Sequence, residues 1–135
     1  MANNKIKRTL CALAAAVCLF SCTGEAVSAG TIPFTVTVGG KGTQDPLSKR
    51  EIKRDGEQTA YFTGTYTSNE KCSIIVRSYN KNNRSIRSKE AVLNYLNKDK
   101  RQDGKYEKKA PAKQYYYMEA KPASGRITVK GRYCP

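Results

Sequence analysis

The sequence contains no histidine among its 135 residues. Histidine is the side chain best suited to proton transfer near neutral pH, and it is the commonest metal ligand. Its absence excludes Ser-His-Asp triads and most zinc sites. Two cysteines far apart in the second half of the chain do not form a zinc knuckle either. The sequence therefore predicts a protein that is not an enzyme and that carries no metal or cofactor.

Large apolar residues other than tyrosine are also scarce. From Gly30 onward, Leu, Ile, Val and Phe together make up 16 of 106 residues. Combined with high charge, this composition falls in the range of disordered chains. All nine tyrosines lie in this part, however, and each adds a large apolar ring whose hydroxyl group can reach the surface. We expect a folded domain whose core depends on tyrosine.

The apolar run near the N-terminus is too short to cross a membrane. Residues 10–21 are apolar almost throughout and follow three basic residues, whereas a spanning helix needs about 20 apolar residues. This pattern predicts an export signal. Val27 and Ala29 form the small-x-small pattern of a cleavage site. We therefore expect residues 1–29 to be a signal peptide and residues 30–135 to form a single secreted basic β domain.

A second cleavage site is the alternative. The segment from Leu19 to Cys22 resembles a bacterial lipoprotein box. Cleavage before Cys22 would place a lipid on that cysteine and anchor the protein at the cell surface.

Cys72 and Cys134 are retained under both cleavages. Because exported chains meet oxidising compartments, we expect these two residues to form a disulfide. The bond would close a loop of about 62 residues and would contribute about 4 kcal/mol to stability in the chain-entropy model.

Alternation with a period of two predicts strands at 32–38, 59–66, 72–79 and 126–133. Residues 113–121 and 125–134 flank a Pro-Ala-Ser-Gly turn, which predicts a hairpin. We expect a mainly β fold: a small antiparallel β-sandwich or open barrel of about six strands, with one short helix and one disulfide.

The helix is expected at 89–97. Val92, Tyr95 and Leu96 fall at helical spacing, and Ser88 could cap the first turn. An irregular strand is the alternative there. Residues 97–113 hold little to bury and are expected to form a mobile loop or a hairpin tip.

Positive charge dominates the predicted mature domain, with 22 basic and 10 acidic residues, a balance of +12. Such a field favours anionic partners. Basic residues and tyrosines on the predicted hairpin and the adjacent loop could form one basic surface with aromatic interleaving, for which an ordinary solvated sheet face is the alternative. The candidate polyanion-binding residues are Arg126, Lys130, Arg132, Tyr115, Tyr117, Lys105, Lys108 and Lys109.

These features favour a secreted, non-enzymatic domain that binds an anionic polymer or surface of the cell envelope or extracellular matrix. A bacteriocin-like protein acting on anionic membranes, with peripheral membrane contact, is one alternative, and an inhibitor of an extracellular enzyme is another. Export argues against intracellular nucleic acid as a partner. The sequence pattern specifies no oligomeric state.

Two segments carry a family resemblance. The opening Pro33-Phe34 with alternating threonines and valines, and the closing strand from Ile127 to Tyr133, resemble a group of short exported proteins of unknown function from Gram-positive bacteria. The likeness spans Ile32 to Tyr133. It implies a β-sandwich and provides no site residues.

Overall fold

The computed structural model describes residues 30–40 and 45–135. The predicted export signal and the lipidation candidate Cys22 lie outside the described residues. Within these two ranges the chain forms strands and turns but no helix, so none is available to span a membrane.

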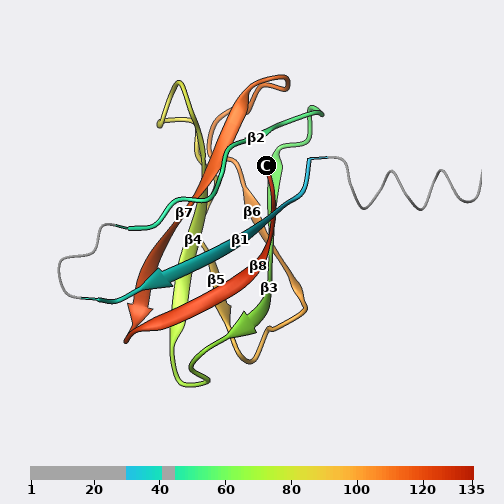
Figure 1. The fold of residues 1–135 in the computed structure, drawn as a ribbon. Coiled ribbons are helices and arrows are strands. Elements are labelled where there is room, and N and C mark those ends of the chain that lie inside the picture. The colour runs from blue at the N-terminus through green and yellow to red at the C-terminus, as the bar shows by residue number, and fades with distance from the viewer. Residues whose placement is uncertain (1–29, 41–44) are drawn as a thin grey trace, which may run out of the picture.

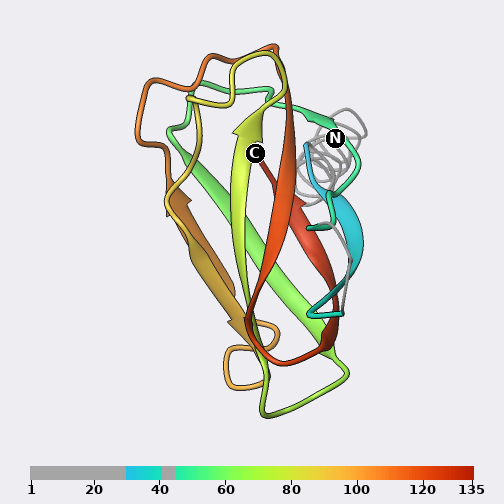
Figure 2. The same ribbon diagram turned by 90° about the vertical axis from the view of Figure 1, so that its left-hand side faces the viewer.

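Eight strands form two four-stranded antiparallel sheets that pack face to face (Figures 1 and 2). Sheet A has the order β1-β8-β3-β6, and sheet B has the order β2-β7-β4-β5. The predicted mainly β fold with antiparallel sheets is confirmed, but the strands number eight where about six were expected. Their bounds are β1 (Ile32–Val38), β2 (Glu51–Ile52), β3 (Thr59–Thr67), β4 (Ser73–Asn80), β5 (Ala91–Asn94), β6 (Arg101–Lys105), β7 (Tyr115–Ser124) and β8 (Ile127–Cys134).

Alternation of apolar and polar residues turns one face of each long strand into the core. In β1, Phe34, Val36 and Val38 are buried while Thr35 and Thr37 are exposed. β8 follows the same rule, since its apolar side is buried and its basic side faces outward. The strand predictions made from periodicity are therefore confirmed for the first and last strands.

Tyrosine fills much of the space between the sheets. Tyr106, Tyr116 and Tyr133 are buried, and the ring of Tyr133 stacks on Phe62 with centroids 5.5 Å apart. The Ser78 hydroxyl group of β4 hydrogen-bonds the phenol groups of both Tyr106, at 2.8 Å, and Tyr133. Because these hydroxyl groups have partners, the rings can be buried without leaving polar atoms unsatisfied.

The predicted helix at 89–97 is wrong. Its middle forms β5, in which Ala91 and Leu93 are buried. The side-chain oxygens of Asn94 and Asn97 then each accept a hydrogen bond from the other residue's backbone N–H, at 3.1 and 3.0 Å. Such local side-chain bonds offer the backbone an alternative to a helix, and here they close a turn directly after the strand.

The segment 97–113, predicted as a mobile loop or hairpin tip, contains β6. This strand pairs with β3 at the edge of sheet A. Only Gln102 and Gly104 turn inward, and a side chain at Gly104 would lie 2.8 Å from the Lys89 carbonyl oxygen and 3.1 Å from the Phe62 ring. Since neither inward residue is apolar, the strand carries no hydrophobic alternation that the sequence could reveal.

The predicted hairpin of β7 and β8 is also wrong. The two strands are consecutive in the chain, but β7 belongs to sheet B and β8 to sheet A. Gly125 joins them with a φ of 61°, a left-handed conformation that glycine adopts without steric cost. The chain therefore crosses from one sheet to the other at this point, as Figure 2 shows at the lower end of the sandwich.

This crossing rules out the predicted disulfide. Cys72 lies beside Gly125, where an added Cβ would be 2.5 Å from its Sγ. Cys134 lies at the opposite end of β8, about 23 Å away at the usual rise of a strand. A disulfide requires Cα atoms about 4–7 Å apart. Both cysteines are accordingly free thiols.

Reduction should therefore leave the stability of the protein unchanged. We expect the same midpoint of thermal unfolding, followed by circular dichroism, with and without dithiothreitol, because no cross-link restrains the unfolded chain. The two thiols of the described residues, Cys72 and Cys134, should both react with a maleimide after denaturation. A lower midpoint under reducing conditions, or fewer than two reactive thiols, would contradict the structure.

Alkaline pH should unfold the protein through its buried phenols. Burial raises the pKa of Tyr106 and of Tyr133, so the unfolded chain loses these protons first as the pH rises past about 10. The stability they contribute is intact below that pH and is lost above it. The tyrosinate absorbance of these buried phenols should therefore appear only at the pH at which the protein unfolds.

The matched control is the exposed Tyr115, whose replacement by phenylalanine should leave the pH of unfolding unchanged. If all nine tyrosines ionised near pH 10 while the fold remained intact, the buried phenol network would be refuted.

Candidate functional site

The eight predicted polyanion-binding residues occupy three separate places in the fold. Arg126, Lys130 and Arg132 lie on or next to β8, in sheet A. Tyr115 and Tyr117 lie on β7, in sheet B. The three lysines Lys105, Lys108 and Lys109 lie at the end of β6 and directly after it. The single surface expected from the hairpin is therefore not formed.

The outer face of sheet A assembles a different set of cations. Arg132 lies opposite Thr63 of β3, which lies opposite Arg101 of β6, so the two arginines share one row across three strands. Strand spacing places their Cα atoms about 10 Å apart. Lys130 is two residues from Arg132 on the same side of β8, about 7 Å along the strand. We call Arg101, Lys105, Lys130 and Arg132 the basic face.

Two tyrosines of β3 interleave with these cations. The Arg101 guanidinium lies 4.2 Å from the centroid of the Tyr61 ring, and the Lys130 ammonium lies 5.4 Å from that of Tyr66. Such cation–π contacts hold long side chains in place over the sheet. Aromatic interleaving is thus present, but Tyr61 and Tyr66 provide it in place of the predicted Tyr115 and Tyr117.

A β-bulge explains why the sequence pattern missed Tyr66. Strict alternation along β3 assigns this residue to the core, together with Ala60 and Phe62. The register with β8 shifts between Gly64 and Tyr66, so that Thr65 is an extra residue. Tyr66 consequently points outward and is 47% exposed.

Most cations of the basic face have no acidic partner. Arg101 pairs with Asp103 at 3.1 Å, but within residues 30–40 and 45–135 no carboxylate lies within ion-pair distance of Lys105, Lys130 or Arg132. Their charge is therefore available to a ligand.

The outer face of sheet B differs because its charges are paired. Glu107 accepts hydrogen bonds from Arg87 at 3.0 Å and from Arg77 at 2.9 Å. The hydrogen bond from Arg87 is the main cause of the lowered pKa of Glu107. Arg84 binds Glu119 at 3.0 Å and also donates to the hydroxyl group of Tyr117 at 2.6 Å. The Arg84 guanidinium also lies 5.9 Å from the centroid of the Tyr117 ring, so this ring already has a cation beside it.

The three predicted lysines line a shallow hollow of about 460 Å³ that adjoins the basic face through Lys105. Gln58, which lines the hollow, fixes the backbone after Lys109. Its side chain accepts a hydrogen bond from the Ala110 N–H at 2.7 Å and donates one to the Ala110 carbonyl oxygen at 3.1 Å. Lys105, Lys108 and Lys109 form no ion pair with any carboxylate of the described chain. Glu107 also lines the hollow, but its carboxylate is bound by Arg77 and Arg87. The three lysines can therefore receive an anionic group.

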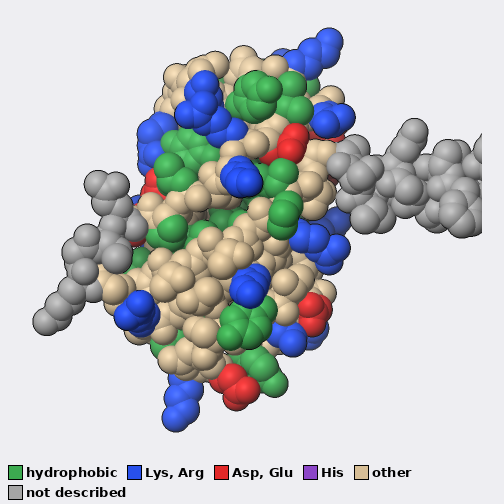
Figure 3. All heavy atoms as spheres, viewed as in Figure 1, with side chains coloured by type: hydrophobic (Ala, Val, Ile, Leu, Met, Phe, Trp, Pro, Cys, Tyr) green, Lys and Arg blue, Asp and Glu red, His purple; other side chains and the backbone are tan. Residues whose placement is uncertain are grey.

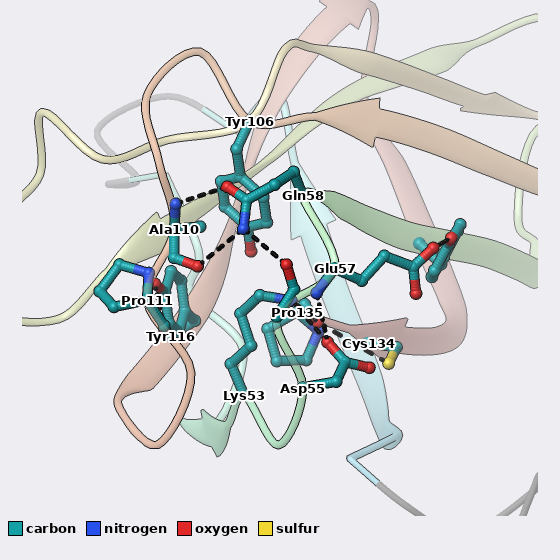
Figure 4. Close-up of polar contacts among 12 residues, drawn as sticks. Lys53, Asp55, Glu57, Gln58, Tyr106, Ala110, Pro111, Tyr116, Cys134 and Pro135 are labelled. Atoms are coloured by element: carbon teal, nitrogen blue, oxygen red, sulfur yellow. Dashed lines mark hydrogen bonds and ion pairs between the residues drawn. The ribbon is translucent and has the colours of Figure 1, made fainter.

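Lys53 is a cation that the sequence pattern did not single out, and it is fully buried (Figure 4). Its ammonium group donates to the Asp55 carboxylate at 2.9 Å and to the Pro135 carbonyl oxygen at 3.4 Å. Burial of Asp55 opposes its ionisation, but the hydrogen bonds from Lys53 and from the Glu57 N–H outweigh this, so that its pKa is lowered. Lys53 thus has a structural partner and no exposed charge.

Within residues 30–40 and 45–135, the thiols and carboxylates form no metal-binding cluster. Burial raises the pKa of the Cys134 thiol, which disfavours the reactive thiolate. In the part of the chain that the structure describes, no three side chains among Cys, Asp and Glu gather closely enough to hold a metal ion. The site that remains is a surface of fixed positive charge.

Comparisons with protein families, with curated proteins and with solved structures found no match for this chain. The resemblance to short exported Gram-positive proteins stays a prediction.

Proposed function

We propose that this chain is an exported, non-enzymatic domain that binds an anionic polymer of the cell envelope or extracellular matrix. The proposed contact surface is the basic face together with the adjoining lysine hollow. The observation that supports it is the unequal pairing of charge: the cations on sheet B have carboxylate partners, whereas Lys105, Lys130 and Arg132 on sheet A have none.

An extended polymer suits this surface better than a small anion does. The cations are distributed over β8, β6 and the segment that follows β6, so no single small ligand can reach all of them. A chain of repeated phosphate, sulfate or carboxylate groups can contact them in sequence. Each contact releases counterions from the polymer, and this release favours binding. Tyr61 and Tyr66 keep two of the cations raised above the sheet.

Binding to long-chain polyphosphate should weaken steeply as salt is raised. Replacing Lys130 and Arg132 together with glutamine should lower the slope of log affinity against log salt by about 1.5, because two counterion-releasing contacts are lost. Affinity measured by fluorescence titration at several salt concentrations tests this expectation.

The control is the double variant Lys71→Gln with Lys81→Gln. It removes the same charge from two exposed residues at the ends of β4, away from the basic face. If both double variants lowered the slope equally, binding would depend on net charge alone and the proposed surface would be wrong.

A second candidate function, action on anionic membranes, is favoured by the turn between β5 and β6. Tyr95 and Leu96 are exposed there, Leu96 to 83%, and Lys98 and Lys100 follow directly. An apolar tip beside basic side chains can enter the headgroup region of an anionic bilayer. The inhibitor hypothesis has less support. Such an inhibitor would insert the lysine-rich segment 98–109 into an acidic cleft, but residues 101–105 of this segment are paired in β6.

If membranes are the target, Leu96→Gln should abolish dye leakage from phosphatidylglycerol vesicles, since it removes the most exposed apolar side chain of the turn. Leu47→Gln alters a leucine outside this turn that is 56% exposed and should leave leakage unchanged. The membrane hypothesis would be contradicted if both variants caused equal leakage. It would also be contradicted if the parent chain released as much dye from phosphatidylcholine vesicles as from phosphatidylglycerol vesicles.

A further inference from the structure

We propose that the free edge of β1 binds an extended segment of a partner protein, in which acidic side chains alternate with apolar ones. The segment would add a strand to sheet A. This inference does not depend on polymer binding by the basic face.

The four edges of the two sheets are not equivalent. On one side of the sandwich, β5 packs against β6, and the Lys89 N–H donates to the Lys105 carbonyl oxygen at 2.8 Å, which closes the space between the sheets. On the other side, β1 and β2 lie at the open edges (Figure 2). β2 has only two residues, and charged residues surround it. β1 is therefore the one long edge on the open side.

Apart from Pro33 near its start, β1 lacks the devices that usually protect an edge. Such strands commonly carry lysine or another charge, or are very short, because exposed backbone groups would otherwise pair with another chain. The segment 30–40 contains no charged residue, in a domain that has 32 charged residues. Figure 3 shows the band along β1 without charged side chains, with basic side chains on both sides of it.

The backbone of β1 presents hydrogen-bonding groups outward. β1 pairs with β8 in an unbroken register that includes Pro33 opposite Arg132. Proline has no N–H, so it is accommodated in a strand where that group would point away from the neighbour. Thr35 and Thr37 share its orientation, because alternate residues of a strand point their N–H groups to the same side. These two N–H groups and their carbonyl oxygens can pair with an added strand.

A hollow beside the edge provides a place for an apolar side chain. It has a volume of about 410 Å³ and lies between β1 and the segment before β2, with Phe34 and Leu47 in its lining. Leu47 is 56% exposed. An inward side chain of an added strand would cover both residues, as alternate side chains do when a peptide extends a sheet.

The charges around the edge select an acidic segment. Lys49 lines the hollow on one side of β1, and Arg132, which lies opposite Pro33, projects from the neighbouring strand on the other. Outward side chains of the added strand would lie between these cations. A second copy of the chain fits poorly, because its own β1 has no acidic residue and both domains carry a large positive charge.

The probe is a fluorescent nine-residue peptide that alternates valine and glutamate, added to the purified chain. We expect binding that slows hydrogen exchange of the Thr35 and Thr37 amides at least tenfold, while amides on sheet B remain unchanged. Thr35→Pro removes one outward donor without touching the β8 register, and it should weaken binding at least tenfold. Circular dichroism checks that this variant folds.

Lys49→Glu should weaken binding by a similar factor, and it provides the test if the proline variant does not fold. Lys89→Glu makes the same charge change on the closed side of the sandwich, where β5 packs against β6, and should leave binding unchanged. A second peptide carries the same residues in two blocks, all glutamate and then all valine, and should not bind.

Equal binding of both peptides, or equal binding to Thr35→Pro and the parent chain, would show attraction by charge alone and overturn the proposal. Concentration-dependent dimers that protect the same amides without peptide would assign the edge to a second copy and would also overturn it. Neither result bears on polyphosphate binding, which is measured with different variants.

Discussion

The crossing of the chain at Gly125 is the constraint on which the rest of the structure depends. Its φ of 61° and the Cys72 side chain packed against it leave room only for glycine. Because β7 and β8 separate at this point, each becomes a central strand of a different sheet. The same separation divides the tyrosines of β7 from the basic residues of β8. It also leaves Cys72 beside the start of β8, whereas Cys134 lies at the end of that strand.

The local patterns of the sequence predict individual strands well and their partners poorly. Period-two alternation identifies β1 and β8 and the correct buried face of each, since burial of one face is a local property. It cannot distinguish a hairpin from a crossing between sheets, because both need two strands and a glycine-containing turn. The sequence pattern misses β6 because the inward residues of this strand are Gln102 and Gly104. The helix at 89–97 is predicted from a spacing that strand β5 and the turn closed by Asn94 and Asn97 override.

Total charge is readable from composition, but its arrangement is not. The acidic residues that neutralise arginines gather around sheet B, where Glu107 and Glu119 each contact more than one basic residue. Sheet A keeps cations without partners. Two of the predicted basic residues, Lys130 and Arg132, do lie together, because they belong to one strand, and Arg126 directly precedes it. Arg101, Tyr61 and Tyr66 join them only through the pairing of β3 with β6 and β8, for which the sequence holds no signal.

Thr65, the extra residue of the β-bulge, determines whether the ring of Tyr66 faces outward or inward. Removing it would restore regular alternation along β3 and direct the aromatic ring at position 66 back between the sheets. A one-codon insertion or deletion can thus add or withdraw an aromatic group from the exterior of the sheet without any substitution of the tyrosine. Related chains could acquire different binding properties by this route while conserving every side chain of the interior.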